Sequence, residues 1–199
     1  MRTLTFATNN EKKAEEVRSV LGNGWLIKTL KESGIEIDIP EPHNTLEENA
    51  REKSSVIHQL TGGDCFSEDT GLEVETLNGE PGVRSARYAG EERGFDANIE
   101  KLLQKMQGST DRRARFRTVI SYIQGNNEFQ FEGICNGIII DEKRGNEGFG
   151  YDPVFVPDGD TRTFAEMSMA DKNRFSHRKK AMDKLIYFLQ ESQDSLKPA

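Results

Sequence analysis

The residues with the clearest chemical potential are two adjacent carboxylates, Glu68 and Asp69, which stand between two short apolar runs. We expect residues 65–66 and 72–77 to form strands on either side, with Gly71 as a turn residue between them. Carboxylates at a strand end are held on rigid backbone and can point into a cleft. Their oxygens are the ligands that a divalent cation prefers, and a spare oxygen can orient a water molecule. The pattern therefore predicts metal-assisted hydrolysis, with a solvated acidic turn as the alternative.

A possible phosphate site lies near the N-terminus. Residues 3–8 alternate polar and apolar side chains and predict a strand, and residues 11–21 carry apolar side chains at helical spacing before Gly22. The start of a helix offers unpaired backbone N–H groups and the positive end of the helix dipole. The segment is not a Walker loop, because the glycines and the Gly-Lys-Ser/Thr ending are missing. The alternative is a strand, turn and helix that bind nothing; if the segment does bind phosphate, the residues that would do so are Thr8, Asn9, Asn10 and Lys13.

A further carboxylate and a lysine come from the next segment. Residues 25–30 and 34–39 predict short strands, and the prolines on both sides of Glu41 force an extended backbone there. A capping box at Thr45 begins a helix that is expected to run to about residue 60. Lys53 lies on that helix and could point a cation toward the carboxylate pair. The alternative for this lysine is a surface position beside an acidic neighbour.

Three glycines surround an aromatic pair in the stretch from Gly145 to Phe155. Flexible backbone beside an aromatic ring suits a flat base, because the ring stacks and the glycines let main-chain N–H and C=O groups approach the edge of the base. The alternative is a glycine-rich hairpin in which Phe149 belongs to the core.

A basic group lies at the start of the last helix, which is expected to run from Ser176 to about residue 191. The helix dipole disfavours cations in the first turn, so these residues require a bound anion, an electron-rich base edge or an acidic surface nearby. The group consists of His177, Arg178 and Lys179, with Lys172 just upstream.

The elements that position these residues indicate an α/β fold. Residues 114–124 and 128–140 give the strongest strand signals, and the short link between them predicts a hairpin. A hairpin that follows helices favours a long mixed sheet over a purely parallel one. Residues 95–106 predict a further helix. We expect one domain over the whole chain of 199 residues, with a frayed tail at residues 193–199.

The composition narrows the classes of partner. The formal net charge of −7 argues against broad electrostatic binding of nucleic acid, although local lysines or a metal can still hold a small anion. Cys65 and Cys135 lie in apolar runs without CxxC spacing, which favours buried free thiols and a reducing compartment. The strand pattern at residues 1–7 is too short for a signal peptide, and no apolar run reaches the length of a membrane span. We therefore expect a cytoplasmic protein without a nucleic-acid or membrane partner.

Together these segments resemble the inosine triphosphate pyrophosphatase family, whose enzymes hydrolyse non-standard purine nucleoside triphosphates. The resemblance covers nearly the whole chain, and five motifs follow one another in the family's order. They are Thr8-Asn9-Asn10 with Lys13, Glu68-Asp69-Thr70-Gly71-Leu72, residues 79–90 with their Pro-Gly and Ser-Ala-Arg, Gly148-Phe149-Gly150-Tyr151-Asp152-Pro153, and Phe175-Ser176-His177-Arg178 followed by Lys180-Ala181.

The resemblance implies a long curved mixed sheet with flanking helices that form two lobes around a central cleft, and a homodimer. It also implies the Mg²⁺-dependent hydrolysis of ITP, dITP or XTP, in which water attacks the α-phosphorus and yields the monophosphate and pyrophosphate. Such an enzyme cleanses the nucleotide pool. The alternative function is a non-catalytic purine nucleotide sensor, which would use the same site without metal-dependent turnover.

The resemblance also implies roles for individual residues. Asp69 would be the general base and would hold the metal together with Glu68 or Glu41. Thr70 stands where the family more often has serine, and it keeps the hydroxyl. The other substrate-binding residues that the resemblance implies are Thr8, Asn9, Asn10, Lys13, Lys53 and Lys172 for the triphosphate, and Phe149, Gly150, Tyr151, Asp152, His177 and Arg178 for the base.

Overall fold

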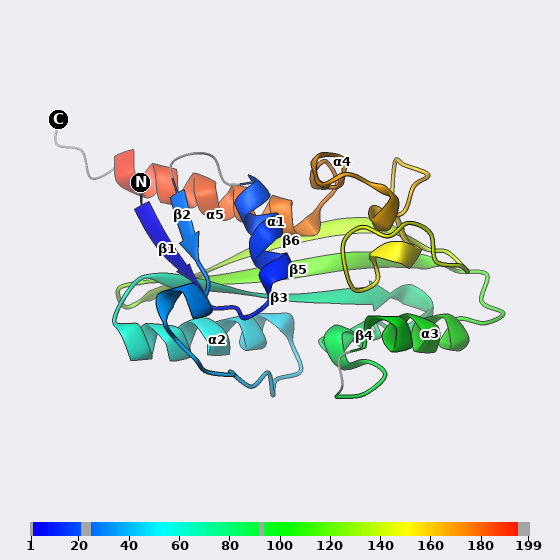
Figure 1. Ribbon diagram of the computed structural model, residues 1–199, viewed down its shortest axis with the longest axis horizontal. Coiled ribbons are helices and arrows are strands. Elements are labelled where there is room, and N and C mark those ends of the chain that lie inside the picture. The colour runs from blue at the N-terminus through cyan, green and yellow to red at the C-terminus, as the bar shows by residue number, and fades with distance from the viewer. Residues whose placement is uncertain (1, 21–24, 92–93, 195–199) are drawn as a thin grey trace. The chain divides into compact units, whose positions relative to one another are not determined.

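The computed structural model describes residues 2–20, 25–91 and 94–194, and Figure 1 shows the elements along the chain. The strands are β1 (Arg2–Phe6), β2 (Trp25–Lys28), β3 (Cys65–Val74), β4 (Pro81–Gly82), β5 (Arg113–Gln124), β6 (Asn127–Ile139) and β7 (Phe155–Pro157). The α-helices are α1 (Glu11–Val20), α2 (Leu46–Thr61), α3 (Phe95–Lys105), α4 (Met169–Asn173) and α5 (His177–Asp194).

The strands form one mixed sheet in the order β2-β1-β3-β5-β6-β7, with β4 beside β3. Strand β1 pairs in parallel with both β2 and β3, whereas β4 is antiparallel to β3 and β7 is antiparallel to β6. The expected α/β fold with a mixed sheet and flanking helices is confirmed.

The chain divides into two compact units. The first comprises Met1–Asp69, Thr118–Gly133 and Arg178–Ala199. Its strands carry apolar side chains on both faces: Phe66 of β3 packs with α1 and α5, whereas the adjacent Cys65 packs with Ile57 of α2. Successive side chains of a strand point to opposite faces, so this unit has helices on each side of its strands.

The second unit comprises Thr70–Arg117 and Ile134–His177. Its core joins Leu102 of α3 to the parts of β3, β5 and β6 that lie within this unit. Phe116 is central to an aromatic group, because its ring lies 4.7 Å from the ring of Phe155 and 6.0 Å from that of Phe164. The loop that contains Phe149 and the helix α4 belong to this unit as well.

The helices that the sequence predicts over residues 11–21, 45–60, 95–106 and 176–191 are present as α1, α2, α3 and α5. Residue 21 lies outside the described residues. Helix α5 continues to Asp194, so the first two residues of the expected tail are helical, while residues 195–199 lie outside the described part of the chain. The hairpin is confirmed as β5 and β6, and Cys65 and Cys135 are buried free thiols. Helix α4 was not expected.

The expectation that Gly71 is a turn residue was wrong. Strand β3 runs unbroken from Cys65 to Val74, and residues 75–77 form a short 3₁₀ turn instead of a strand. A Cβ atom at Gly71 would lie 2.7 Å from the carbonyl oxygen of Gly82 in β4. Glycine is required here because another backbone approaches closely.

The strand expected over residues 34–39 is also absent from the structure. Gly34 ends a 3₁₀ turn at Lys31–Ser33 with a left-handed backbone (φ 71°), and residues 35–44 have no helix or strand. The alternating apolar side chains Ile35, Ile37 and Ile39 pack against the buried cluster of α2 without pairing as a strand. The segment that carries Glu41 is therefore a loop held by side chains.

Among the described residues, no helix combines the length and apolar character needed to cross a membrane.

Candidate active site

The acidic pair lies where a parallel neighbour strand stops. Strand β1 pairs with β3 as far as Phe6 and Phe66, and the Ala7 N–H donates to the Phe66 carbonyl oxygen at 2.7 Å. Strand β3 then continues past the end of β1, and Glu68 and Asp69 lie on this continuation. The carboxylates were expected at a strand end; they lie in the middle of β3, beside the end of β1. The rigid backbone that their chemistry requires is present.

Asp69 shares a lysine with Glu41. Lys53, on α2, places Nζ 3.4 Å from Oδ1 of Asp69 and 2.5 Å from Oε1 of Glu41. Both Lys53 and Asp69 are buried. The surface alternative for Lys53 is therefore excluded, and the side chain points from the inner face of the helix toward both carboxylates, as the sequence predicted for the acidic pair.

Burial and neighbouring charges together set the pKa values of Asp69 and Lys53. Removal from water raises the pKa of Asp69, and the charges of Lys53 and Lys13 offset only part of that rise. For Lys53, burial alone would lower the pKa, but Asp69 and Glu41 outweigh it, and the pKa of the ammonium group is raised. The arrangement gives a carboxylate that is a better proton acceptor than usual beside a permanent cation.

Glu68 belongs to a separate buried ion-pair group. Arg178 donates to both of its carboxylate oxygens, at 2.7 and 2.8 Å, and also to Glu16 of α1. Lys13 Nζ lies 3.2 Å from Oε1 of Glu68. Burial would raise the pKa of Glu68, but Arg178 and Lys13 hold it well below its usual range. Glu68 is thus a fixed anion that orients two cations.

The turn between β1 and α1 is held by its own polar side chains. The Thr8 hydroxyl accepts from the Asn10 N–H at 3.1 Å, and Asn10 Oδ1 accepts from the Lys13 N–H at 3.2 Å, which caps the helix. Asn9 Nδ2 donates to the carbonyl oxygen of Ile37 at 2.9 Å. The expected phosphate-binding residues are therefore brought together at the start of α1, and their hydrogen bonds shape the turn.

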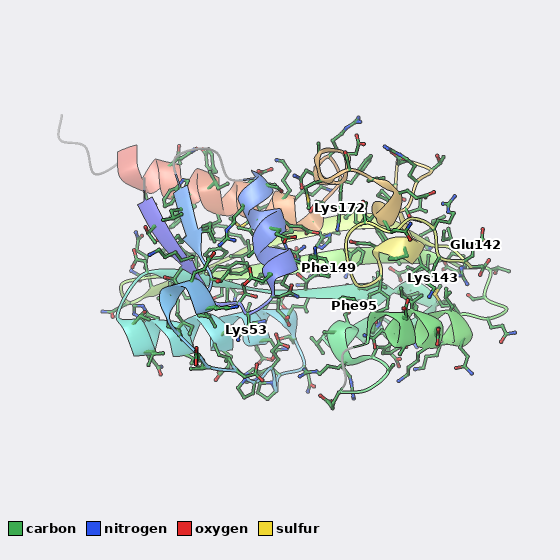
Figure 2. All side chains as sticks on the ribbon, viewed as in Figure 1. Lys53, Phe95, Glu142, Lys143, Phe149 and Lys172 are labelled. Carbon is green, nitrogen blue, oxygen red and sulfur yellow. The ribbon has the colours of Figure 1, made fainter. Side chains whose placement is uncertain are left out.

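In the second unit, Asp152 holds the glycine-rich loop. Its Oδ2 accepts from the Phe149 N–H at 2.9 Å and from Lys172 Nζ at 2.6 Å. Gly148 has φ +74°, and a Cβ atom there would lie 2.1 Å from the same oxygen. Lys172 also stands 5.4 Å from the centre of the Phe149 ring, and both are labelled in Figure 2. The sequence-predicted aromatic residue, lysine and carboxylate form one group.

Other predicted base-site residues lie nearby within that unit. The Tyr151 hydroxyl donates to the Ser85 carbonyl oxygen at 2.9 Å, which ties the loop to residues 79–90. His177 is buried and stacked on Phe116, with ring centres 4.7 Å apart. Gly150 adopts a left-handed backbone (φ 62°), and Thr70 follows Asp69 along β3. The roles of Tyr151, His177 and Gly150 in binding a base, and of Thr70 in binding the substrate, stay predictions.

The profile of the Ham1 family matches residues 4–188 of the chain. The chain belongs to the Ham1 family. It is similar to the dITP/XTP pyrophosphatase of Flavobacterium psychrophilum, with 49% identity over 93% of this chain and 97% of that one, and to the dITP/XTP pyrophosphatase of Porphyromonas gingivalis, with 48% identity over 95% and 98%.

Solved structures agree with this membership. The Staphylococcus aureus Ham1 protein matches 96% of this chain and 100% of its own at 38% identity, with a TM-score of 0.87. A HAM1 protein from Coxiella burnetii has the same TM-score and the same coverage at 33% identity. The resemblance inferred from the five motifs is confirmed at the level of the family, since the similar proteins from F. psychrophilum and P. gingivalis carry the name dITP/XTP pyrophosphatase.

The Ham1-family chain contains residues that fit a magnesium ion. Asp69 Oδ2 is buried and has no hydrogen-bond partner in the described part of the chain, so a carboxylate oxygen is available beside Glu41. No group of three or more His, Cys, Asp and Glu side chains gathers among residues 2–20, 25–91 and 94–194. Mg²⁺ is commonly held by one or two protein carboxylates with substrate phosphates completing its coordination, so the pair suffices. Glu68 fits less well, since Arg178 occupies both its oxygens.

Sequence reasoning assigned no role to two residues that take part in this Ham1-family site. Glu16 is a buried carboxylate on α1, three residues after Lys13, and it binds Arg178. Asn49 is buried one helical turn before Lys53 and bonds to the backbone of His43. The available signal was a polar side chain within the apolar stripe of an amphipathic helix, which indicates a buried partner.

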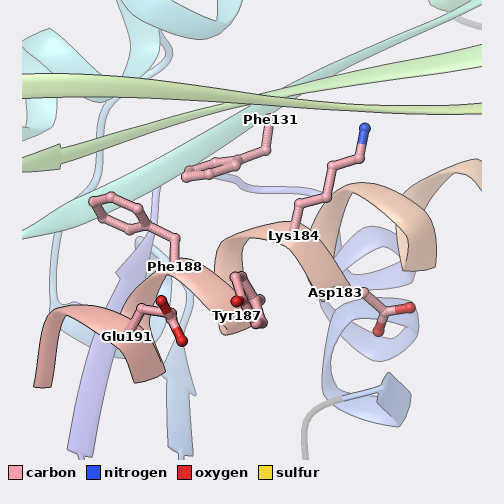
Figure 3. Close-up of a pocket in the computed structure, with 6 residues that line it drawn as sticks. All are labelled: Phe131, Asp183, Lys184, Tyr187, Phe188 and Glu191. Carbon is pink, nitrogen blue, oxygen red and sulfur yellow. The ribbon is translucent and has the colours of Figure 1, made fainter. Parts of the chain in front are cut away.

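A hollow elsewhere on the Ham1-family chain contains none of the predicted site residues. Figure 3 shows it between α5 and β6. The volume of the hollow is about 590 Å³. Its lining residues are Phe131, Asp183, Lys184, Tyr187, Phe188 and Glu191.

Proposed function

We propose that this protein hydrolyses the non-standard purine nucleoside triphosphates dITP, ITP and XTP to the monophosphate and pyrophosphate. The observation that carries the proposal is the buried Asp69, whose Oδ2 lacks a hydrogen-bond partner among the described residues while Lys53 stands beside Oδ1. The names of the similar proteins, dITP/XTP pyrophosphatases, supply the substrate class.

In the proposed reaction, the Asp69 carboxylate accepts a proton from water. The water oxygen forms a bond to the α-phosphorus, and the bond from that phosphorus to the bridging oxygen of the β-phosphate breaks, so pyrophosphate leaves. The raised pKa of Asp69 supports this role, because a base is most effective when its pKa approaches the working pH. Lys53 keeps Asp69 oriented and balances its charge.

We propose that Asp69 and Glu41 hold Mg²⁺ and that Glu68 orients the triphosphate site. Bound Mg²⁺ would offset the charge of the phosphates and stabilise the leaving pyrophosphate. Glu68 fixes Lys13 at the start of α1, where the backbone N–H groups and the dipole favour anions. A triphosphate carries about four negative charges, so a local cluster of this kind is needed in a chain whose net charge is −7.

We propose that the loop Phe149–Asp152, with Lys172 and His177, receives the base. Lys172, which was expected to bind the triphosphate, is assigned to this group because it donates to Asp152. A ring with a cation 5.4 Å from its centre supports stacking of a flat, electron-rich base, and glycine backbone allows close approach. Hypoxanthine and xanthine present a 6-oxo acceptor, whereas adenine presents a 6-amino donor. A buried donor left unpaired against adenine gives discrimination on the order of 10⁴-fold. The base contact expected of Arg178 has less support, because its guanidinium binds Glu68 and Glu16.

Two further expectations belong to this proposal. The first is a homodimer, which the resemblance implies. The second is a cytoplasmic location, which agrees with the two buried free cysteines. Sedimentation equilibrium of the purified protein tests the first, and fractionation of the source cells tests the second.

Product analysis tests the proposed reaction. ITP, XTP, GTP and ATP are incubated with the protein and Mg²⁺ at slightly alkaline pH, and phosphate is measured before and after inorganic pyrophosphatase is added. We expect phosphate only after that addition, with ITP and XTP far ahead of ATP and GTP. Asp69→Asn should abolish turnover and retain ITP binding. Asp183→Asn changes an exposed residue of α5, and that variant should hydrolyse ITP at the wild-type rate. Direct release of phosphate would exclude attack at the α-phosphorus, and ITP binding without turnover would favour the nucleotide sensor.

A further inference from the structure

The loop that carries Glu41 has no backbone ladder to hold it. Residues 35–44 form neither helix nor strand, so their position depends on bonds to other elements. On the upstream side, Asn9 Nδ2 donates to the Ile37 carbonyl oxygen at 2.9 Å, but Asn9 is exposed. A carboxylate on such a segment can serve a metal only if something rigid fixes the backbone beside it.

Asn49 of α2 binds the backbone immediately downstream of Glu41. Its Oδ1 accepts from the His43 N–H at 2.9 Å, and its Nδ2 donates to the His43 carbonyl oxygen at 3.1 Å. One side-chain amide therefore satisfies both backbone groups of a single loop residue. Asn49 is 1% exposed and its two bonds to His43 are partly buried, so removing the side chain takes away a fixed partner from both backbone groups.

The same face of α2 holds the Glu41 carboxylate itself. Lys53 follows Asn49 by four residues, and side chains at this spacing lie on one face of a helix. Lys53 Nζ lies 2.5 Å from Glu41 Oε1, and Figure 2 labels Lys53. The helix thus binds the loop near Glu41 through Asn49 at the backbone of His43 and through Lys53 at the carboxylate, in addition to the packing of Ile35, Ile37 and Ile39.

We propose that Asn49 is a positioning residue for the metal site. By fixing the backbone at His43, it holds Glu41 beside Asp69 in the geometry that a divalent cation requires. The inference rests on the proposed function in one respect, since it takes Glu41 as a metal-binding carboxylate. Groups that orient a metal ligand typically change metal affinity by about 10- to 100-fold when removed.

The chain offers a matched control in Asn98. This residue lies on α3 in the other unit, is also buried, and also fixes a loop through its amide. Its Oδ1 accepts from the Ala89 N–H at 2.6 Å, and its Nδ2 donates to the Ala86 carbonyl oxygen at 3.2 Å. Asn98→Ala removes the same kind of clamp from a loop that carries no predicted metal ligand.

The test compares Asn49→Ala and Asn98→Ala in the full chain. Mn²⁺ affinity is measured by calorimetry without nucleotide, and the half-saturating Mg²⁺ concentration is measured with ITP. For Asn49→Ala we expect Mn²⁺ affinity to fall and the half-saturating Mg²⁺ concentration to rise, each by about 10- to 100-fold, with a smaller loss of kcat at saturating Mg²⁺. For Asn98→Ala we expect both quantities to stay within about 2-fold, although urea unfolding should show a comparable loss of stability.

A double variant separates positioning from general damage. If Asn49 acts through Glu41, then Asn49→Ala should add nothing to the loss of Mn²⁺ affinity already caused by Glu41→Gln. Additive losses, or equal effects of the two asparagine variants on metal affinity, would overturn the proposal. If Asn49→Ala does not fold, Asn49→Asp keeps the acceptor for the His43 N–H, removes the donor, and should show the same shift to a smaller degree.

The two proposals can fail separately. A wild-type protein that binds Mn²⁺ but leaves ITP intact would refute the proposed function, while the comparison of variants would still decide the role of Asn49. A wild-type protein that hydrolyses ITP with full activity in excess chelator would refute the metal role of Glu41, and with it the role of Asn49.

Discussion

Arg178 binds Glu68 through two parallel hydrogen bonds: Nε donates to Oε2 at 2.7 Å, and Nη2 donates to Oε1 at 2.8 Å. Both side chains are buried, and Arg178 also bonds to Glu16. A buried pair of this kind gains little over an apolar pair, yet removing one partner leaves an uncompensated charge in the interior. Removal of Arg178 would take a cation away from two buried carboxylates, Glu68 and Glu16, and leave Lys13 as a cation beside Glu68.

Arg178→Ala should therefore lower the free energy of unfolding by about 3–5 kcal/mol. Arg115→Ala is the matched control, because Arg115 forms an equally short bond to Glu73 at 2.6 Å but is 44% exposed. We expect that variant to lose no more than about 1 kcal/mol, since exposed pairs contribute little. Urea unfolding of both variants measures the difference. Similar losses of unfolding free energy in the two variants would show that Arg178 does not stabilise the fold through a buried charge network.

The same group predicts a pH dependence of stability. The pKa of Glu68 in the folded protein lies below the ordinary carboxyl value of 4.5, because Arg178 and Lys13 outweigh the effect of burial. A carboxyl with a lowered folded-state pKa stabilises the fold fully above its unfolded pKa, and that stabilisation is lost as the pH falls below about 4.5. Urea unfolding at pH 7, 4.5 and 3 should show a steeper loss for the wild type than for Glu68→Gln. Parallel pH profiles would contradict the assignment.

Sequence reasoning was accurate where the physical determinant is local. The helical repeat of residues 45–60 predicted α2, and Lys53 lies on its buried face, one of the two positions that the sequence left open. The turn after β1 was also predicted correctly, because its conformation depends on neighbouring residues: Asn10 caps the helix three residues before Lys13. The loop around Phe149 was identified by its glycines, and Gly148 does allow Asp152 to close it.

Sequence reasoning was inaccurate where the conformation or partner of a residue depends on residues far away in the chain. Gly71 carries the same local signal in a turn and in a crowded strand, and only the approach of Gly82 distinguishes them. The basic first turn of α5 indicated an acidic partner or an anion, but the partners of Arg178 lie 110 and 162 residues away, at Glu68 and Glu16. No spacing rule connects such positions.

The crowding at Gly71 gives a further prediction. In Gly71→Ala the added Cβ would lie 2.7 Å from the Gly82 carbonyl oxygen, so the two strands must separate. Overpacking of this kind costs about 1–3 kcal/mol. Gly63→Ala is the control, since the nearest atom to a Cβ there is 3.7 Å away and the position is exposed, and it should change stability by no more than about 0.5 kcal/mol. Thermal unfolding of the two variants decides; equal midpoints would contradict the close approach of β4.

The last prediction concerns Asp152, whose Oδ2 serves both the Phe149 N–H and Lys172. Asp152→Asn keeps the shape of the side chain but removes the charge that balances the buried ammonium group. A charged hydrogen bond contributes about 1.5–3 kcal/mol, so we expect kcat/KM for ITP to fall by about 10- to 100-fold, mainly through KM.

Asp96→Asn provides the comparison for Asp152→Asn. Asp96 accepts from Lys143 at 2.9 Å within the same unit, but its side chain is 80% exposed. Loss of that pair should leave the kinetics of ITP hydrolysis within about 2-fold, because water replaces the bond. Steady-state kinetics and calorimetric ITP binding check both variants. If Asp152→Asn retained the KM of the wild type, the Phe149 loop would not be the site that receives the base.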